Sequence, residues 1–342
     1  MLWDEAFITN ALDVPIQEVI PFDPPVSVKY VTDREHNLWS KVINLELCDR
    51  QSLSSLMANV GFIRELSFTH LIPEVKKGLL GPPADAFLSF PTSIKLEQCF
   101  MTISHPLSTY GSAYDVMRRI GSEGLTEKLV AAIIARTLLC VERLHAQGVM
   151  HRGLCAGHLL LVHNESSSSN IQVRLCGLGS LAQSLSSHFK VARNDLPQIH
   201  FSWRGWNVQR SPNGNLLYGH PVAWYSPEMI AQDFNGYSLP SDVYSLGLTI
   251  AELFTGRVPF AGLKPTVIAL KKLSEQEVPD LNLLDTNEKP PSQGMRDVYA
   301  ACTHFEPSKR PSAKQLLQMP WIEWGLRMSL EPSDLDPCNT SA

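Results

Sequence analysis

The stretch from Val149 to Val162, VMHRGLCAGHLLLV, gathers side chains that could do chemistry. Two imidazoles, a guanidinium and a thiol stand in it, at His151, His158, Arg152 and Cys155. The pattern is typical of a catalytic loop that leads into a buried strand. However, Gly153 stands where a general acid or base is needed, and glycine has no side chain that could exchange a proton. A second position suited to a polar metal ligand holds His158.

The composition is that of a chain that can bury a sizeable core. It has 342 residues, of which 44% are hydrophobic and 18% charged, and its formal net charge is −5. This length predicts one large domain or two lobes. The charge balance gives no sign of a surface for nucleic acid or for an anionic membrane. The N-terminus does not resemble a secretory signal, and the most apolar stretch, Leu129 to Val141, is too short to span a bilayer.

Seven cysteines are spread along the chain, and no two lie within four residues of each other. Their spacing is not that of a zinc knuckle or a redox pair. Several stand in apolar runs, as Cys140 does in ARTLLCVERL, so we expect buried free thiols in a reducing compartment. The expected location is therefore cytoplasmic, with a nuclear pool as a second expectation.

The first ~105 residues predict a small sheet with one helix. VSVKYV and LWSKVINLEL are short β-rich runs separated by the polar turn TDREHN, and AFLSF and EQCFMTI predict two more strands. Between them, apolar residues from Leu53 to Ile63 recur at helical spacing, with Asp49 as the candidate N-cap.

Helical patterns dominate the rest of the chain. TEKLVAAIIARTLLCVERLHAQG predicts a buried helix closed by Gly148, and SDVYSLGLTIAELFTG predicts a helix from an N-cap at Ser241 to a C-cap at Gly256. MRDVYAACTHF and SAKQLLQMPWIEWGL each predict one more helix. From Leu330 the chain is polar and acidic, and we expect it to fray. The predicted fold class is α+β, with a small β-rich lobe before a larger helical lobe.

Six motifs follow one another in an informative order: WSKVINLE, HRGLCAGHLLL, LCGLG, YSPE, SDVYSLGL and PSKRPSA. In this order they resemble the protein-kinase fold, over roughly Val19 to Trp324. The domains that the resemblance implies are an N-terminal extension (1–18), a kinase-like N-lobe (19–105), a C-lobe (106–326) with an activation segment (177–228), and a flexible tail (327–342).

The resemblance identifies which parts of a kinase N-lobe are missing. Phosphoryl transfer is mostly positioning and charge neutralisation, and a glycine-rich loop normally covers the nucleotide phosphates. The matching segment here, VIPFDPPVSV, has no glycine and three prolines, which lack N–H donors. The strand lysine survives as Lys41, but its usual helix glutamate is replaced by Ala58 or Asn59, and Glu65 lies about two turns too far along. Lys41 is then a groove lysine kept by descent or a vestigial phosphate contact.

The catalytic positions of the resemblance are also lost. In kinases the catalytic loop supplies a base, a phosphate-binding lysine and a metal-binding asparagine. These positions hold Gly153, Cys155 and His158 here, and the metal-chelating Asp-Phe-Gly is replaced by Gly177, Leu178 and Gly179. One loss could be compensated. Losses at the phosphate loop, the helix glutamate, the base, the lysine and both metal positions together argue against phosphoryl transfer.

Residues with structural roles in that fold are kept. The resemblance implies that His151 packs into the lobe and that Arg152 anchors the activation segment. It also implies a buried ion pair between Glu228 and Arg310, and an Asp242 that braces the backbone of the catalytic loop. Because the scaffold is kept while the chemistry is lost, the sequence predicts a folded pseudokinase and no enzyme.

Longer stretches resemble the STE20-related kinase adaptor (STRAD) pseudokinases, namely YGSAYDVM, VARNDLPQ, VAWYSPEMI and FNGYSLPSDVYSLGLTIAEL. That family also carries His at the position of His158, and Ser-Gly-Leu where this chain has Cys176 to Leu178. The resemblance implies an adaptor that binds and allosterically activates a partner serine/threonine kinase of the liver kinase B type. It also implies a helical-repeat scaffold of the calcium-binding protein 39 family as a second partner.

Three features depart from that family. The phosphate loop has no glycine, which puts ATP binding in doubt, and the chain ends in PCNTSA without the Trp-Glu-Phe terminus that docks the scaffold. The activation segment carries an extra stretch, HFSWRGWNVQRSPNGNLLYGH. Its tryptophans and arginines are typical binding anchors, namely Trp203, Arg204, Trp206 and Arg210. A loop that packs its aromatics on its own lobe is an equal alternative.

Two other functions remain open. One is a nucleotide-binding switch without chemistry. The other is a weak, unorthodox kinase of the sterile-twenty group that uses Lys41 and His158 with an unusual metal. We expect no resident nucleotide or metal, and neither nucleic acid nor a membrane as a partner.

Overall fold

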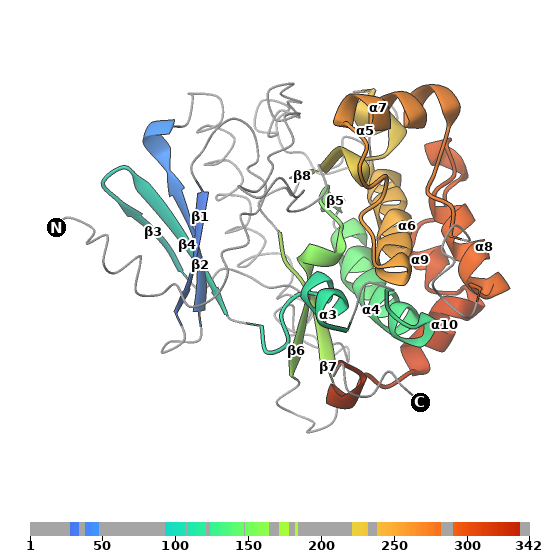
Figure 1. The fold of residues 1–342 in the computed structure, drawn as a ribbon, viewed down its shortest axis with the longest axis horizontal. Coiled ribbons are helices and arrows are strands. Elements are labelled where there is room, and N and C mark those ends of the chain that lie inside the picture. Colours follow the sequence, from blue (N-terminus) through green and yellow to red (C-terminus); the bar gives the residue numbers. More distant parts are fainter. Residues whose placement is uncertain are drawn as a thin grey trace.

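The computed structural model describes residues 28–33, 38–47, 93–106, 108–120, 124–146, 148–163, 171–177, 182–183, 221–231, 238–281 and 290–335. Figure 1 shows a four-stranded sheet on one side of the molecule and most of the helices on the other. This division confirms the predicted α+β class, with a small β-rich lobe and a larger helical lobe.

The four-stranded sheet is antiparallel throughout, in the order β1-β2-β4-β3. Its strands are β1 (Val28–Asp33), β2 (Leu38–Asn44), β3 (Ser93–Glu97) and β4 (Phe100–Pro106), and the 3-10 turn η1 (Leu45–Leu47) follows β2. The strand predicted over EQCFMTI is confirmed from Phe100 onward as β4, but its start is wrong, because the chain reverses at Gln98, whose φ of 51° no strand can contain. β3 and β4 form a hairpin around this turn, and β3 was not predicted. AFLSF and the helix predicted after Asp49 lie outside the described residues.

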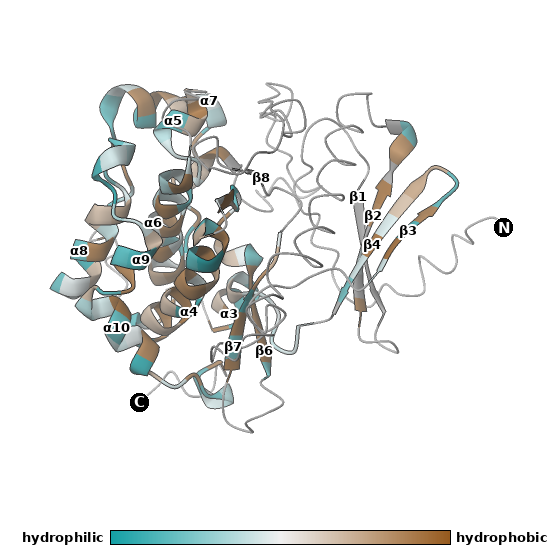
Figure 2. Ribbon diagram, turned by 180° about the vertical axis from the view of Figure 1, so that it is seen from behind, coloured by the Kyte–Doolittle hydropathy of each residue, from teal (hydrophilic) through white to brown (hydrophobic). Residues whose placement is uncertain are grey.

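Two long helices form the centre of the larger lobe: α4 (Glu127–Ala146) and α6 (Leu239–Thr255). Every residue of α6 from Ser241 to Thr255 is buried, as expected for a helix that is apolar on most of its circumference. Figure 2 shows the same contrast in hydropathy, with α6 largely brown and the outer helices α8 (Gln293–Cys302) and α10 (Pro320–Arg327) alternating in colour.

The C-cap predicted for α6 is confirmed, and its N-cap is wrong. Gly256 closes the helix with a φ of 68°, a conformation that glycine adopts without strain. The N-cap is Ser238, because Pro240 favours an earlier first turn. Ser241 lies at the third helical position, where its hydroxyl oxygen accepts a hydrogen bond from the backbone N–H of Ser238 at 3.4 Å.

SAKQLLQMPWIEWGL forms two helices and not the single one predicted. α9 (Ala313–Leu316) ends before Pro320, which has no N–H to continue it and instead occupies the first turn of α10. α10 packs closely on α4, because Gly325 has no side chain: a Cβ there would lie 2.3 Å from the carbonyl oxygen of Ala131.

The segment after α10 is packed as far as Leu335. Leu330 and Leu335 are 0% and 4% exposed and belong to the main hydrophobic core, and the N–H of Ile171 donates to the carbonyl of Leu330 at 3.0 Å. The expectations of a flexible tail from residue 327 and of fraying from Leu330 are therefore wrong as far as Leu335, because Leu330 and Leu335 bury their side chains in the core. Residues 336–342 lie outside the described ones.

The remaining elements surround α4 and α6. They are α3 (Ala113–Ile120), β5 (Val149–Met150), η5 (Ala156–His158), β6 (Leu159–His163), β7 (Ile171–Leu175), β8 (Ala182–Gln183), η8 (Pro221–Ala223), α5 (Pro227–Ile230), α7 (Pro265–Leu270), the π-helical turn η9 (Lys271–Glu275), η10 (Pro307–Lys309) and η11 (Pro332–Leu335). No helix in the described part of the chain has both the length and the apolar character needed to cross a bilayer.

Candidate functional site

The stretch VMHRGLCAGHLLLV folds as a loop between two short strands. β5 precedes the loop, η5 closes it, and β6 follows, paired antiparallel with β7. The register Leu159↔Leu175 and the hydrogen bond from the N–H of Cys176 to the carbonyl of His158, 2.9 Å, bring the end of β7 back to the loop. Gly177 therefore lies beside His158, although nineteen positions separate them in sequence.

Asp242, at the start of α6, holds the backbone of this loop. Its carboxylate accepts hydrogen bonds from the N–H groups of His151 and Arg152, each at 2.7 Å, and lies 2.9 Å from Nε2 of His145. Burial raises the pKa of Asp242, but the bonds from His145 and His151 outweigh burial and keep the pKa below its ordinary value. The two backbone bonds also fix Arg152 at a φ of 64°, which is unfavourable for a residue with a side chain.

His151 is a buried structural imidazole. It is 0% exposed, its Nε2 donates to the carbonyl of Cys176 at 2.8 Å, and its Nδ1 accepts from the N–H of Gly153 at 3.3 Å. Burial lowers the pKa of His151 to about 4, and His158 acts in the same direction. The ring is therefore neutral at pH 7, with both nitrogens engaged in the fold.

The kinase resemblance matches Gly153, Cys155 and His158 to catalytic positions, and His158 contacts the other two. Nδ1 of His158 donates to the carbonyl of Gly153 and lies 3.5 Å from Sγ of Cys155, which is buried. His151 and His158 also meet edge to face, with ring centroids 5.9 Å apart. The imidazole of His158 is thus directed at its own loop.

By the kinase resemblance, Gly177 corresponds to the aspartate that chelates the metal. Its φ is 80°, and a Cβ built there would meet three ring atoms of His158 at 2.8 Å. The residues therefore do not fit a magnesium ion, since neither Gly153 nor Gly177 offers a ligand and His158 fills the adjoining space. Within the described ranges, no group of three or more His, Cys, Asp or Glu side chains is arranged to hold a metal ion.

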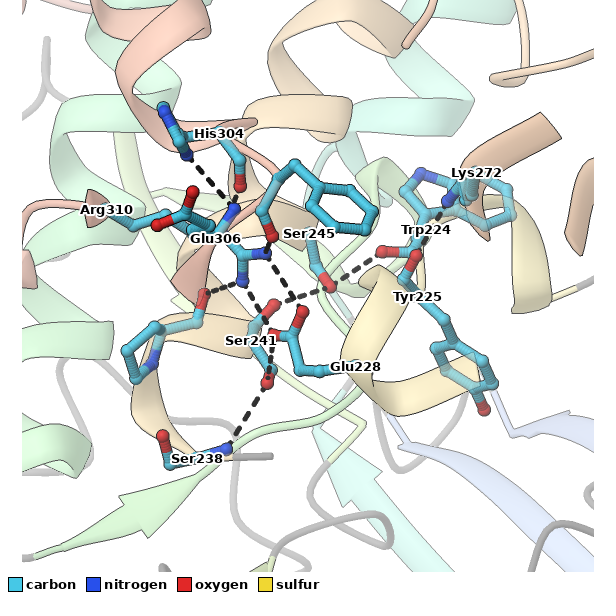
Figure 3. A network of polar contacts seen from close by, with 12 residues as sticks. Trp224, Tyr225, Glu228, Ser238, Ser241, Ser245, Lys272, His304, Glu306 and Arg310 are labelled. Carbon is cyan, nitrogen blue, oxygen red and sulfur yellow. Dashed lines mark hydrogen bonds and ion pairs between the residues drawn. The ribbon is translucent and has the colours of Figure 1, made fainter. Parts of the chain in front are cut away.

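Arg310 and Glu228 form a bidentate ion pair inside the lobe (Figure 3). Nη1 lies 2.7 Å from Oε1, Nη2 lies 2.9 Å from Oε2, and the hydroxyl of Ser241 donates to Oε1 at 2.7 Å. Arg310 also donates to the carbonyls of Pro240, His304 and Phe305. The pair therefore joins α5, which ends the activation segment, to α6 and to the segment before α9.

Two buried residues that position this region were not predicted from the sequence. Glu252 of α6 accepts hydrogen bonds from the N–H of Ala156 and from Nε1 of Trp224, both at 2.9 Å. A glutamate inside the apolar run of a buried helix was a usable signal. The buried Lys272 had no signal in the sequence, because KKL in a polar segment is typical of a solvated surface.

The other predicted site residues are placed only in part. Lys41 lies on β2, opposite Tyr30 of β1 and Ile103 of β4 in the backbone register. The proline-containing loop VIPFDPPVSV is outside the described residues as far as Ser27, and so are Ala58, Asn59 and Glu65. The same holds for the activation-segment anchors Trp203, Arg204, Trp206 and Arg210.

Comparison with known proteins agrees with this geometry. The protein kinase domain family matches residues 94–322, which is more than half of the chain. The chain is 32% identical over 235 residues to the STE20-related kinase adapter protein beta of Homo sapiens, which covers 68% of this chain and 46% of that protein. Over 262 residues it is 30% identical to the STE20-related kinase adapter protein alpha of Bos taurus, with 77% and 57% covered.

A more distant relative extends the same match. The chain is 27% identical over 267 residues to the STE20-related kinase adapter protein strd-1 of Caenorhabditis elegans, with 72% of this chain and 62% of that protein covered. The chain spans about half the length of the curated relatives it matches. From the kinase-type lobe, the order of its motifs and these matches, the chain belongs to the protein kinase family and, within it, to the STE20-related kinase adapter (STRAD) family.

Proposed function

We propose that this chain is a catalytically silent adaptor that binds and allosterically activates a partner serine/threonine kinase of the liver kinase B type. The observation that carries the proposal is the close approach of the His158 ring to Gly177, which leaves no room for a side chain at Gly177. The structural residues Asp242, Glu228 and Arg310 keep their hydrogen bonds and their ion pair. The names of the relatives, each a kinase adapter protein, support the adaptor role.

The loop chemistry supports the absence of phosphoryl transfer. Transfer to a hydroxyl needs a group that accepts its proton and metal ligands that neutralise the phosphates. From His151 to His163 the chain contains no carboxylate. The ring of His151 is buried and bonded at both nitrogens, and His158 donates to the carbonyl of Gly153.

The docking surface in this proposal is the activation segment, residues 177–228. The anchors Trp203, Arg204, Trp206 and Arg210 belong to it by sequence, and its C-terminal end is held by α6. A scaffold of the calcium-binding protein 39 family is the proposed third member of the complex, because the STRAD resemblance implies it.

The test is a titration of the purified chain into the partner kinase, with and without the scaffold, that follows phosphorylation of a peptide by the partner. We expect a saturable rise of roughly 5- to 100-fold, the usual range of allosteric coupling. Replacing Trp203 and Trp206 together by alanine is expected to weaken binding, whereas Trp324→Ala on α10 is the matched control and is expected to bind as wild type. A partner kinase that neither binds the chain nor changes in activity contradicts the proposal.

A further inference from the structure

Lys272 is a lysine with no exposed surface. It lies in the π-helical turn η9, directly after α7, and is 0% exposed. Its neighbour Lys271 instead reaches the surface, where it pairs with Glu275 and Glu277. Lysine is almost never fully buried without partners, and π-helical turns are rare and frequently functional. The contacts of the buried ammonium therefore indicate what it does.

The ammonium of Lys272 donates to three main-chain carbonyls of one short segment. Nζ lies 2.6 Å from the oxygen of Ala223, 2.7 Å from that of Tyr225 and 3.2 Å from that of Val222. Figure 3 shows Lys272 with the Nζ–carbonyl contact to Tyr225, in the same region of polar contacts as the pair of Glu228 and Arg310. The three N–H donors of an ammonium thus all meet oxygens of residues 222–225.

Two aromatic rings complete the site around the ammonium. The ring centroids of Tyr244 and Phe260 both lie 5.2 Å from Nζ, within the range of cation–π attraction. Burial lowers the pKa of Lys272 well below its ordinary value, whereas Glu228, the three carbonyl oxygens and the two ring faces favour the protonated form. Hydrogen bonds from an ammonium are charge-assisted, so they are stronger than those of a neutral donor.

The same segment is also held by α6. Trp224 donates its indole N–H to Glu252 at 2.9 Å, and its carbonyl accepts from the hydroxyl of Ser245 at 2.8 Å. Val222, Ala223 and Trp224 are all buried. Residues 222–225 are therefore fixed through both main chain and side chain, by residues that follow them in sequence.

These four residues lie near the C-terminal end of the activation segment (177–228), immediately before Ser226 and α5. In active kinases this segment is commonly ordered by phosphorylation, through new pairs of arginine with phosphate. Lys272 needs no such modification, since its partners are carbonyl oxygens that are always present. A surface fixed in advance loses less conformational entropy when a partner binds.

We propose that Lys272 is a positioning residue that holds residues 222–225 in one backbone shape without modification of the activation segment, so that this part of the docking surface for the partner kinase is formed before the partner arrives. The part that concerns the partner rests on the proposed function. The part that concerns the backbone does not, and can be measured on the isolated chain.

The experiment compares wild type, Lys272→Met and Lys271→Met as full chains, by amide hydrogen exchange followed by partner binding. In Lys272→Met we expect exchange of residues 222–231 to rise at least about tenfold, while α4 keeps its protection, and the affinity for the unmodified partner to fall by a similar factor. Lys271→Met is expected to behave as wild type. Ile322→Ala, a core truncation in α10, controls for global stability: it is expected to lower Tm without selective exchange at 222–231.

The outcomes separate the two proposals. Unchanged exchange at 222–231 in Lys272→Met overturns the inference, as does a uniform loss of protection over the whole lobe. Local exchange with undiminished partner affinity also overturns it, because the fixed shape would then not matter for docking. If wild type itself fails to bind the partner, the proposed function fails, while the exchange data still decide the role of Lys272. Should Lys272→Met not fold, Lys272→Gln, which keeps two of the N–H donors, is expected to show the same local exchange in weaker form, and wild-type exchange in that variant contradicts the inference.

Discussion

The imidazole of His158 lies against the backbone of Gly177, so close that a Cβ at Gly177 would come within 2.8 Å of three ring atoms. In the kinase pattern these two positions carry the metal-binding asparagine and the chelating aspartate. Here the first position carries the larger imidazole of His158, and the second, Gly177, has no side chain. The ring therefore occupies the space beside the glycine backbone. Replacing Gly177 alone by aspartate would therefore press the new side chain against the His158 ring and would not by itself create a metal site.

Gly177→Ala is expected to destabilise the fold by about 2–4 kcal/mol. The left-handed backbone at a φ of 80° contributes about 1–2 kcal/mol of this, and the overlap with His158 contributes the rest. The measurement is urea unfolding. Gly262→Ala is the matched control, because Gly262 has a φ of 82° but a Cβ there would meet nothing within 4 Å.

His158→Ala should rescue part of the loss in Gly177→Ala. A double-mutant cycle is expected to give a coupling of about 1–3 kcal/mol between the two positions, as for other residues in direct contact. Strict additivity of the two substitutions would show that the ring and the glycine do not constrain each other.

Arg310→Met is expected to lower the free energy of unfolding by about 3–5 kcal/mol, because it leaves the buried carboxylate of Glu228 without its cation. The control is Lys309→Met, whose pair with Glu306 is exposed and is expected to contribute less than about 0.5 kcal/mol. Equal losses in the two variants, measured by thermal or urea unfolding, contradict a central role of the buried pair.

The stability of the fold is expected to decrease as the pH falls from about 6.5 to about 4. The pKa of His151 is about 4 in the folded state and near 6.5 when unfolded, so in this window the unfolded chain binds more protons. The loss amounts to ~3 kcal/mol over the window. Asp242 adds a further loss only at lower pH, since its folded pKa lies below its ordinary value of 3.8.

Urea midpoints between pH 7.5 and 4.5 measure this dependence. His151→Gln is expected to flatten the profile, because it removes the buried imidazole. A wild-type profile that is flat over this range is incompatible with a buried, neutral His151.

Titration with ATP and Mg²⁺ or Mn²⁺ is expected to leave Tm unchanged, because the catalytic loop and Gly177 offer no metal ligands that fit. A ligand that binds only the folded state at 100 times its Kd would stabilise it by about 2.7 kcal/mol, which a thermal shift detects easily. A clear metal-dependent rise in Tm would favour the nucleotide-binding switch.

The fold was largely predictable, and the errors have local causes. The long apolar patterns of α4 and α6 predicted both helices. The predicted boundaries of helices and strands were wrong at Ser238, Pro320 and Gln98, where a single residue determines where a helix or a turn begins. Leu330 and Leu335 are buried by residues that are distant in sequence, and a local sequence pattern cannot predict such contacts.

The site was predictable wherever a motif fixed the position of a residue. Glu228, Arg310 and Asp242 stand in such motifs, and so do the degenerate Gly153, His158 and Gly177. The role of Lys272 was not predictable, because its partners lie about fifty residues earlier in the chain and are main-chain carbonyls, which every sequence contains.

The central claim is that the scaffold is kept while phosphoryl transfer is lost. The most direct measurement is transfer of labelled γ-phosphate from ATP to a peptide library by the purified chain alone, with Mg²⁺ and with Mn²⁺. We expect no turnover from wild type and none from Gly153→Asp, because Gly177 still leaves a metal without its carboxylate. Metal-dependent turnover by wild type that Lys41→Met abolishes would contradict the account.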